Sequence, residues 1–135
     1  MTESDEVLDN LAQVSFAVMA HLSRVAAAHE LSLTQLRVLG ILRDRTPKMA
    51  ELATHLGLDR SSVSGLVDRA VRRGLVSREA GRDDGRSVRV SLTPEGHSLA
   101  AELTAEVSRA MAPLTSGLSA ADRTRLGVLL GRMLA

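Results

Sequence analysis

A run of small hydroxyl side chains stands near the middle of the chain, where Ser61, Ser62 and Ser64 follow Asp59. Serine donates or accepts hydrogen bonds with either base type, and small side chains let a helix backbone approach base edges in the DNA major groove. Asp59 is by itself a good N-cap, so the serines are not needed for capping. We therefore predict a DNA-reading helix whose exposed face carries Ser61, Ser64, Gly65, Asp68 and Arg72, flanked by Arg60, Ser62 and Arg69. The alternative is a serine-rich first turn that only caps a helix.

A second candidate for chemistry is the charged stretch "GRDDGRSVRV" at 81–90, which runs into an alternating strand pattern. A tight hairpin needs about two turn residues, so this loop is longer than its turn requires. We predict that Arg82 and Arg86 lie along a phosphate backbone or enter a minor groove, where the negative potential is strongest. Asp83 or Asp84 can orient the Arg86 guanidinium through a bidentate pair. The alternative is an ordinary surface loop whose charges offset one another.

The distribution of charge supports a polyanionic partner. Residues 37–90 hold 12 Lys and Arg against 7 Asp and Glu, whereas the rest of the chain holds 5 against 9. The net charge of +1 therefore hides a basic middle between two acidic ends. A basic segment of this kind is typical of nucleic-acid binding, although chance clustering on a solvated surface gives the same pattern.

The elements that must position these residues are mainly helical. Spacing and capping signals predict a helix over 5–29, one starting at Ser32 or Thr34 that turns Leu36, Leu39, Gly40 and Leu42 inward, and a short one at 49–56. The next helix runs from Asp59 to Gly74 and buries Val63, Leu66, Val67, Ala70 and Val71. A hairpin precedes a helix that starts at Thr93 and ends near Pro113, and Ser119 caps the last helix with Asp122 as its capping-box partner.

The two helices around "GLD" have the steric pattern of a helix-turn-helix. Small Ala53 allows a close helix crossing, Gly57 accepts a left-handed turn, and Val63 fixes the crossing from inside. Helix pairs in plain bundles share some of this pattern. Since the basic hairpin follows directly, the sequence predicts a winged helix-turn-helix, in a mainly α fold with a small β-hairpin.

Composition limits the remaining possibilities. A chain of 135 residues with 44% apolar content is long enough for one domain. The absence of Cys excludes disulfides, thiolate zinc sites and thiol redox switches. The start "MTESDEVLDN" is acidic and unlike a signal peptide, and we expect no apolar run near the roughly 18 residues of a membrane span. We therefore expect a cytoplasmic protein with no membrane partner.

Three segments together resemble the MarR family of bacterial winged-helix regulators: "LTQLRVLGIL", "ELATHLGLDRSSVSGLVDRAVRRGLVSRE" and "DDGRSVRVSLTPEG". The resemblance covers nearly the whole chain. It implies that Ser61, Ser62, Ser64 and Arg69 belong to the DNA-reading helix and that Arg86 is the wing arginine. The chain departs from the family at Gly85, where many members carry a second basic residue. The full set of predicted DNA contacts is Lys48, Arg60, Ser61, Ser62, Ser64, Gly65, Arg69, Arg82 and Arg86.

The helices outside the winged-helix core predict a homodimer. The core spans 32–92, and the segments 1–31 and 93–135 are apolar on more than one face. Since burying apolar surface is worth about 25 cal/mol per Å², we expect these segments to form a helical dimerisation region, as the resemblance also implies. Two recognition helices would then lie roughly 34 Å apart and read an inverted repeat in double-stranded DNA.

The resemblance also implies a cavity between the dimerisation helices and the DNA-binding lobe that holds a small aromatic or anionic effector. Phe16, Met19, His21 and Arg37 are its candidate lining residues, although ordinary core packing is the better explanation of Phe16 and Met19. No two of the four histidines share an i, i+4 spacing, so we predict no metal site and no cofactor.

Other functions find less support. The chain has no Ser-His-Asp spacing, glycine-rich phosphate loop or paired acidic motif in a suitable setting, so we do not expect an enzyme. A winged-helix module that binds protein, or a transcriptional activator without an effector, remains an alternative. Analogy with the family favours repression.

Overall fold

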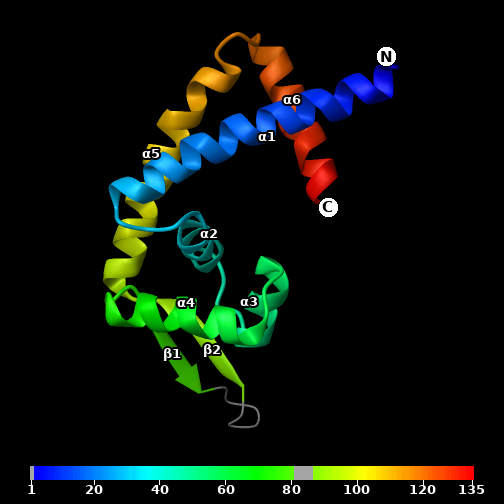
Figure 1. The fold of residues 1–135 in the computed structure, drawn as a ribbon. Helices are drawn as coiled ribbons and strands as arrows, with labels where there is room; N and C mark the ends of the chain where they lie inside the picture. The colour runs from blue at the N-terminus through cyan, green and yellow to red at the C-terminus, as the bar shows by residue number, and fades with distance from the viewer. Residues whose placement is uncertain (1, 81–86) are drawn as a thin grey trace.

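The fold is known from a computed structural model that describes residues 2–80 and 87–135. Six helices and two strands occur in those residues (Figure 1). In chain order they are α1 (Glu3–Ala28), α2 (Leu33–Leu42), α3 (Met49–Leu56), α4 (Arg60–Arg72), β1 (Val76–Ala80), β2 (Val88–Leu92), α5 (Pro94–Thr115) and α6 (Ala120–Leu134). This order confirms the predicted mainly α fold with one hairpin. Arg82 and Arg86, with Asp83, Asp84 and Gly85, lie outside the described residues.

The core lies between α2, α3, α4 and the hairpin, which together form the lower lobe in Figure 1. Leu42, Leu52, Val63, Val67 and Val90 are almost fully buried there. The two strands pair antiparallel from Val76 opposite Leu92 to Ala80 opposite Val88. Their inward side chains close the lobe from below, as the alternation in the sequence predicts.

The helix ends follow the predicted capping chemistry. Ser32, rather than Thr34, caps α2, where its hydroxyl accepts a hydrogen bond from the Gln35 N–H at 3.1 Å. Asp59, Thr93 and Ser119 cap α4, α5 and α6. Two glycines adopt left-handed backbone at helix ends, Gly57 with φ 65° and Gly74 with φ 74°, which a side chain would resist. These caps fix the directions of the helices around the turn.

Some predicted inward positions are wrong. Gly40 is exposed, whereas its neighbours Val38 and Leu39 are buried, because α2 packs through a different arc of its surface. Val71 is 37% exposed, because it lies at the edge of the buried face of α4, beside the buried Ala70. The helix α5 continues through Pro113 to Thr115 instead of ending near the proline. At α6, the Ser119 hydroxyl accepts from the Asp122 N–H at 3.1 Å, but the Asp122 side chain does not accept from the Ser119 N–H, so the predicted capping box is wrong.

The helices α1, α5 and α6 form arms that extend away from the lobe (Figure 1). Helix α1 packs along α5, but Leu8, Phe16 and several other large apolar residues on α1 stay exposed, and α6 has no buried residue. Contrary to our expectation, α1 is long and apolar enough to span a membrane by length and composition alone, with a mean hydropathy of 1.3 in its best window. The expectation rested on unbroken runs of apolar residues. Helix α1 has polar residues scattered among its apolar ones and still reaches a high mean hydropathy.

The lobe and the arms meet at the start of α5. A Cβ atom added to Gly96 would lie 2.0 Å from the carbonyl oxygen of Leu75, so only glycine fits where α5 crosses the beginning of the hairpin. Thr93 strengthens this junction, because its hydroxyl donates to the Gly74 carbonyl at 2.6 Å. The hairpin and α5 are therefore held together by backbone contact.

Candidate nucleic-acid interface

The exposed face of α4 carries the serines that the sequence singles out. Ser61 and Ser62 are exposed, and Ser64 and Gly65 are half-buried beside them. One serine also takes part in the cap: the Ser61 hydroxyl donates to the Asp59 carboxylate at 2.7 Å, as does the Ser62 N–H at 2.7 Å. The expectation that all three serines are superfluous for capping is therefore wrong for Ser61. Ser64 makes no hydrogen bond through its hydroxyl to any residue in 2–80 or 87–135, so that hydroxyl is available to a partner.

The Asp59 carboxylate remains charged at this end of α4. The Ser62 N–H, followed by the hydroxyls of Ser61 and Ser62, holds the pKa of Asp59 below its usual value of 3.8. The carboxylate neutralises the partial positive charge at the start of the helix. Asp59 is thus a fixed acceptor that orients the first turn of the reading helix.

A shallow groove of about 360 Å³ runs along this face and joins α4 to the start of α2. It brings together four of the predicted contacts, Ser61, Ser62, Gly65 and Arg69. Ser32 and Thr34 also line the groove, and sequence reasoning missed both. The capping box at Ser32 could have indicated them, since it marks the N-terminus of α2. The N–H groups at a helix N-terminus favour phosphate.

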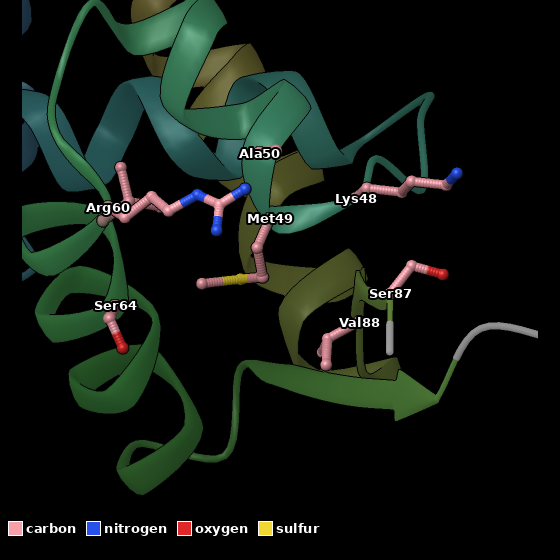
Figure 2. A pocket seen from close by; sticks show the side chains of 8 residues that line it. Lys48, Met49, Ala50, Arg60, Ser64, Ser87 and Val88 are labelled. Carbon is pink, nitrogen blue, oxygen red and sulfur yellow. The ribbon is translucent and has the colours of Figure 1, made fainter. Parts of the chain in front are cut away.

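A second cavity of about 330 Å³ lies between α4, the start of α3 and the start of β2, at the loop end of the hairpin (Figure 2). Arg60 and Ser64 reach it from α4, and Lys48 and Ser87 lie on its other side, with Met49 between them. The backbone of Lys48 pairs with that of Arg89 in β2 through an isolated antiparallel β-bridge. Two predicted DNA contacts, Arg60 and Ser64, therefore line the cavity from α4, whereas Lys48 lies across from them with its side chain pointing away (Figure 2).

The hairpin is oriented by ion pairing and hydrogen bonding to the helices. Arg78 of β1 forms an ion pair with Asp68 of α4, so this carboxylate on the predicted reading face is already engaged. Arg89 of β2 donates to the Thr46 carbonyl at 2.9 Å, and the Val90 N–H donates to the Pro47 carbonyl at 2.9 Å. These contacts hold both strands against the helix-turn-helix.

A largely apolar cavity of about 390 Å³ lies between α1, α2 and α5. Arg37 lines it, as predicted, together with Leu22, Gly40, Arg43, Thr104 and Val107, among others. The other three candidates do not line it: Phe16 is 65% and Met19 42% exposed, and the His21 Nδ1 lies 2.6 Å from Arg24. Periodicity could not separate these residues from the true lining, because the cavity depends on how three distant helices pack.

The two arginines of this cavity are held in different ways. Arg37 donates to the carbonyl of His55, near the end of α3, at 2.8 Å. Arg43 donates to the Thr104 hydroxyl of α5 at 2.9 Å. One guanidinium therefore connects the cavity to the helix-turn-helix and the other connects it to the arms.

The comparisons with known proteins agree with this architecture. The sequence profile of the MarR family matches residues 29–87. The chain is 28% identical over 131 residues to the HTH-type transcriptional regulator PecS of Dickeya dadantii, covering 94% of this chain and 79% of PecS. Among solved structures, a MarR-family regulator from Rhodococcus sp. RHA1 matches with a TM-score of 0.83 at 24% identity, over 98% of this chain and 95% of that one.

A further solved structure links the same fold to control of DNA binding. The chain is 25% identical to Bordetella bronchiseptica BpsR, with a TM-score of 0.77, over 96% of this chain and 99% of BpsR. That structure concerns the regulation of BpsR binding to DNA by 6-hydroxynicotinic acid. Taken with the winged helix-turn-helix built around α3, α4 and the hairpin, these matches make the chain similar to MarR-family transcriptional regulators, in sequence over residues 29–87 and in fold over nearly its whole length.

Proposed function

We propose that the protein is a homodimeric repressor that reads an inverted-repeat operator through α4. The observation that carries this proposal is the groove in which Ser61, Ser62, Gly65 and Arg69 lie together on an exposed helix face. A helix with small hydroxyl residues at its start and an arginine further along enters the major groove without holding its backbone away from the bases. As an operator-binding regulator, the protein acts in the cytoplasm.

The arms support a dimer with two-fold symmetry. Their exposed large apolar residues are Val7, Leu8, Leu11, Val14, Phe16, Met19, Leu114, Val128, Leu129, Leu130, Met133 and Leu134. Exposed apolar surface on this scale marks a protein interface. A second copy covers it without any further partner, and it sets two α4 helices side by side for the two half-sites of an operator.

The test is binding to genomic DNA fragments, followed by variants of the two kinds of contact. The fragments that the protein retains give the operator. We expect Arg69→Ala to weaken binding to all sequences and to lower the salt slope, by about 0.9 for each phosphate that is no longer neutralised. Ser64→Ala should instead change which base is preferred within the half-site.

Each outcome separates the proposal from its alternatives. Equal and small effects of Arg69→Ala and Ser64→Ala would overturn the contact scheme. Binding to DNA that is weak and insensitive to salt would favour a protein-interaction module. Transcription from a promoter that carries the operator gives the sign of regulation: a rise when the protein is added would identify an activator.

We also propose that the cavity between α1, α2 and α5 binds an aromatic acid that releases the operator. BpsR is regulated by 6-hydroxynicotinic acid, and NadR, which is 26% identical to this chain, was solved in complex with 4-hydroxyphenylacetate. The apolar lining of the cavity suits a ring, and Arg37 and Arg43 suit its carboxylate. An anion that binds Arg37 competes with the His55 carbonyl, so it weakens a contact that holds the end of α3.

The effector proposal is tested with 4-hydroxyphenylacetate as the probe. We expect Arg37→Ala to weaken probe binding at least about tenfold, or 1.4 kcal/mol, as measured by calorimetry. Arg45→Ala is the matched control, because Arg45 is exposed nearby and does not line the cavity. Equal binding of the probe to both variants would show that the anion lies elsewhere.

A further inference from the structure

Three side chains with metal-binding atoms meet where the end of α1 lies against α5. His29 caps the C-terminus of α1, and Glu102 and Glu106 lie one turn apart on α5. One ligand atom from each residue lies within 4.8 Å of the other two. The His29 Nε2 and the Glu106 Oε2 are already 2.6 Å apart. The cluster is therefore assembled by the packing of two helices, because His29 lies 73 residues before Glu102 and 77 before Glu106 in the sequence.

The charge within this cluster is not balanced by cationic side chains. Glu106 pairs with His29 alone, and within 2–80 and 87–135 no Lys or Arg forms an ion pair with either glutamate. Glu102 makes no hydrogen bond or ion pair in the same ranges. Like charges at i, i+4 on a helix destabilise it. The site thus places two carboxylates and one imidazole together with room for one more positive charge.

We propose that His29, Glu102 and Glu106 bind a divalent transition-metal ion, with Zn²⁺ as the best match. Imidazole nitrogen and carboxylate oxygen are ligands that zinc accepts, whereas Mg²⁺ and Ca²⁺ prefer oxygen alone. Three protein ligands leave a fourth, tetrahedral position open to water or to a small anion. Glu102 is exposed and His29 and Glu106 are half-buried, so the ion can enter from solvent.

The geometry requires only small adjustments. Zinc–ligand bonds of about 2.0–2.2 Å put neighbouring ligand atoms roughly 3.3–3.5 Å apart. The His29 and Glu106 atoms must separate by less than about 1 Å from their hydrogen-bonded distance to meet this requirement. The exposed side chain of Glu102 closes the remaining gap by rotation.

The position of the cluster connects it to the reading helix. Arg73, the C-cap of α4, donates to the carbonyls of His29 at 3.0 Å and Glu30 at 3.1 Å. Glu30 has a left-handed backbone with φ 58°, which bends the chain sharply at this point. An ion bound to the His29 side chain therefore fixes a turn that also carries the end of α4.

The experiment is a titration of the full-length, chelator-treated chain with Zn²⁺ by calorimetry, and with Co²⁺ by its visible absorption. We expect one ion per chain and a visible band typical of a four-coordinate site. Glu102→Gln should weaken Zn²⁺ binding at least tenfold, and because Glu102 is exposed, the change leaves the fold intact. His97→Gln is the matched control, since His97 is an exposed histidine on the same helix. Millimolar Mg²⁺ should not compete.

Two results would overturn the proposal. One is the absence of saturable Zn²⁺ binding to the wild-type chain, which would leave His29 and Glu106 as a simple hydrogen-bonded pair. The other is equal affinity in Glu102→Gln and the wild type. Because the titration contains no DNA, its failure is distinct from a failure of the proposed operator binding.

Discussion

The lobe and the arms of this protein bury their apolar residues in opposite ways. In the part of the chain that the structure describes, 15 of 19 buried core residues lie in 32–92. By contrast, 12 of 14 exposed large hydrophobic residues lie on α1, α5 and α6. The lobe thus satisfies its apolar side chains within one copy of the chain. The arms leave theirs exposed, so the stability of the lobe and the assembly of the proposed dimer should respond to different substitutions.

The strongest challenge to this contrast is a double charge substitution on α6. We expect Leu129→Glu with Met133→Glu to raise the dimer dissociation constant at least about a hundredfold, or 2.7 kcal/mol, because each copy would have to bury two unpaired carboxylates. Sedimentation velocity measures the change. Val71→Glu is the control, because Val71 is 37% exposed and Leu129 is 41% exposed, but Val71 lies in the lobe. We expect it to leave the dimer dissociation constant unchanged. A double variant that dimerises like the wild type would show that α6 lies outside the interface.

A glycine pair tests how the lobe is joined to the arms. Gly96→Ala puts a Cβ atom against the Leu75 carbonyl oxygen, so we expect a loss of about 1–3 kcal/mol in the free energy of unfolding. Gly40→Ala has no atom within 4 Å of the added Cβ, and helix propensity should raise stability by up to about 1 kcal/mol. Urea denaturation followed by circular dichroism gives both values. Destabilisation of equal size by both substitutions would mean that backbone contact at Gly96 is not the cause.

The smallest expected effect compares one capping carboxylate in each region. Hydrogen bonds from Ser62 hold the pKa of Asp59 below 3.8, so its charge stabilises the fold above pH 3.8, and this stabilisation is lost as the pH falls through the folded value. The stability difference between the wild type and Asp59→Asn should therefore shrink below pH 3.8. Asp5, whose pKa is lowered by hydrogen bonds from the N-cap Thr2, completes the capping box of the arm helix α1, and Asp5→Asn should leave global unfolding unchanged. Urea midpoints measured across pH 2.5–7 give these differences. A stability difference between the wild type and Asp59→Asn that stays constant below pH 3.8 would contradict this account.

Much of the lobe could be predicted from local sequence. The caps Asp59, Thr93 and Ser119 could be predicted because a helix cap depends only on a few neighbouring backbone groups. The left-handed Gly57 and Gly74 are equally local. Periodicity also identified most of the buried face of α4, but not its edge at Val71, which is 37% exposed although the neighbouring Ala70 is buried. Local signals therefore predicted the elements and their order.

The sites that join distant elements could not be predicted in the same way. His29 lies 73 residues before Glu102 in the sequence. A search for two histidines at i, i+4 does not detect a cluster that combines one histidine with two glutamates from another helix. The cavity near Arg37 escaped for the same reason, since its walls come from α1, α2 and α5. Ser32 and Thr34 line the same groove as the predicted reading face of α4 because α2 packs beside α4, and this packing is not visible in the local sequence.

The unbroken course of α5 has a consequence for protein engineering. Its 22 residues make a rod of about 33 Å, which starts beside the hairpin at Pro94 and ends among the arms. A graft of the winged helix cut at residue 92 would lose the helix on which its hairpin rests. A chimera that is meant to keep the DNA preference of this protein must therefore take α5 along and exchange only the residues beyond Thr115.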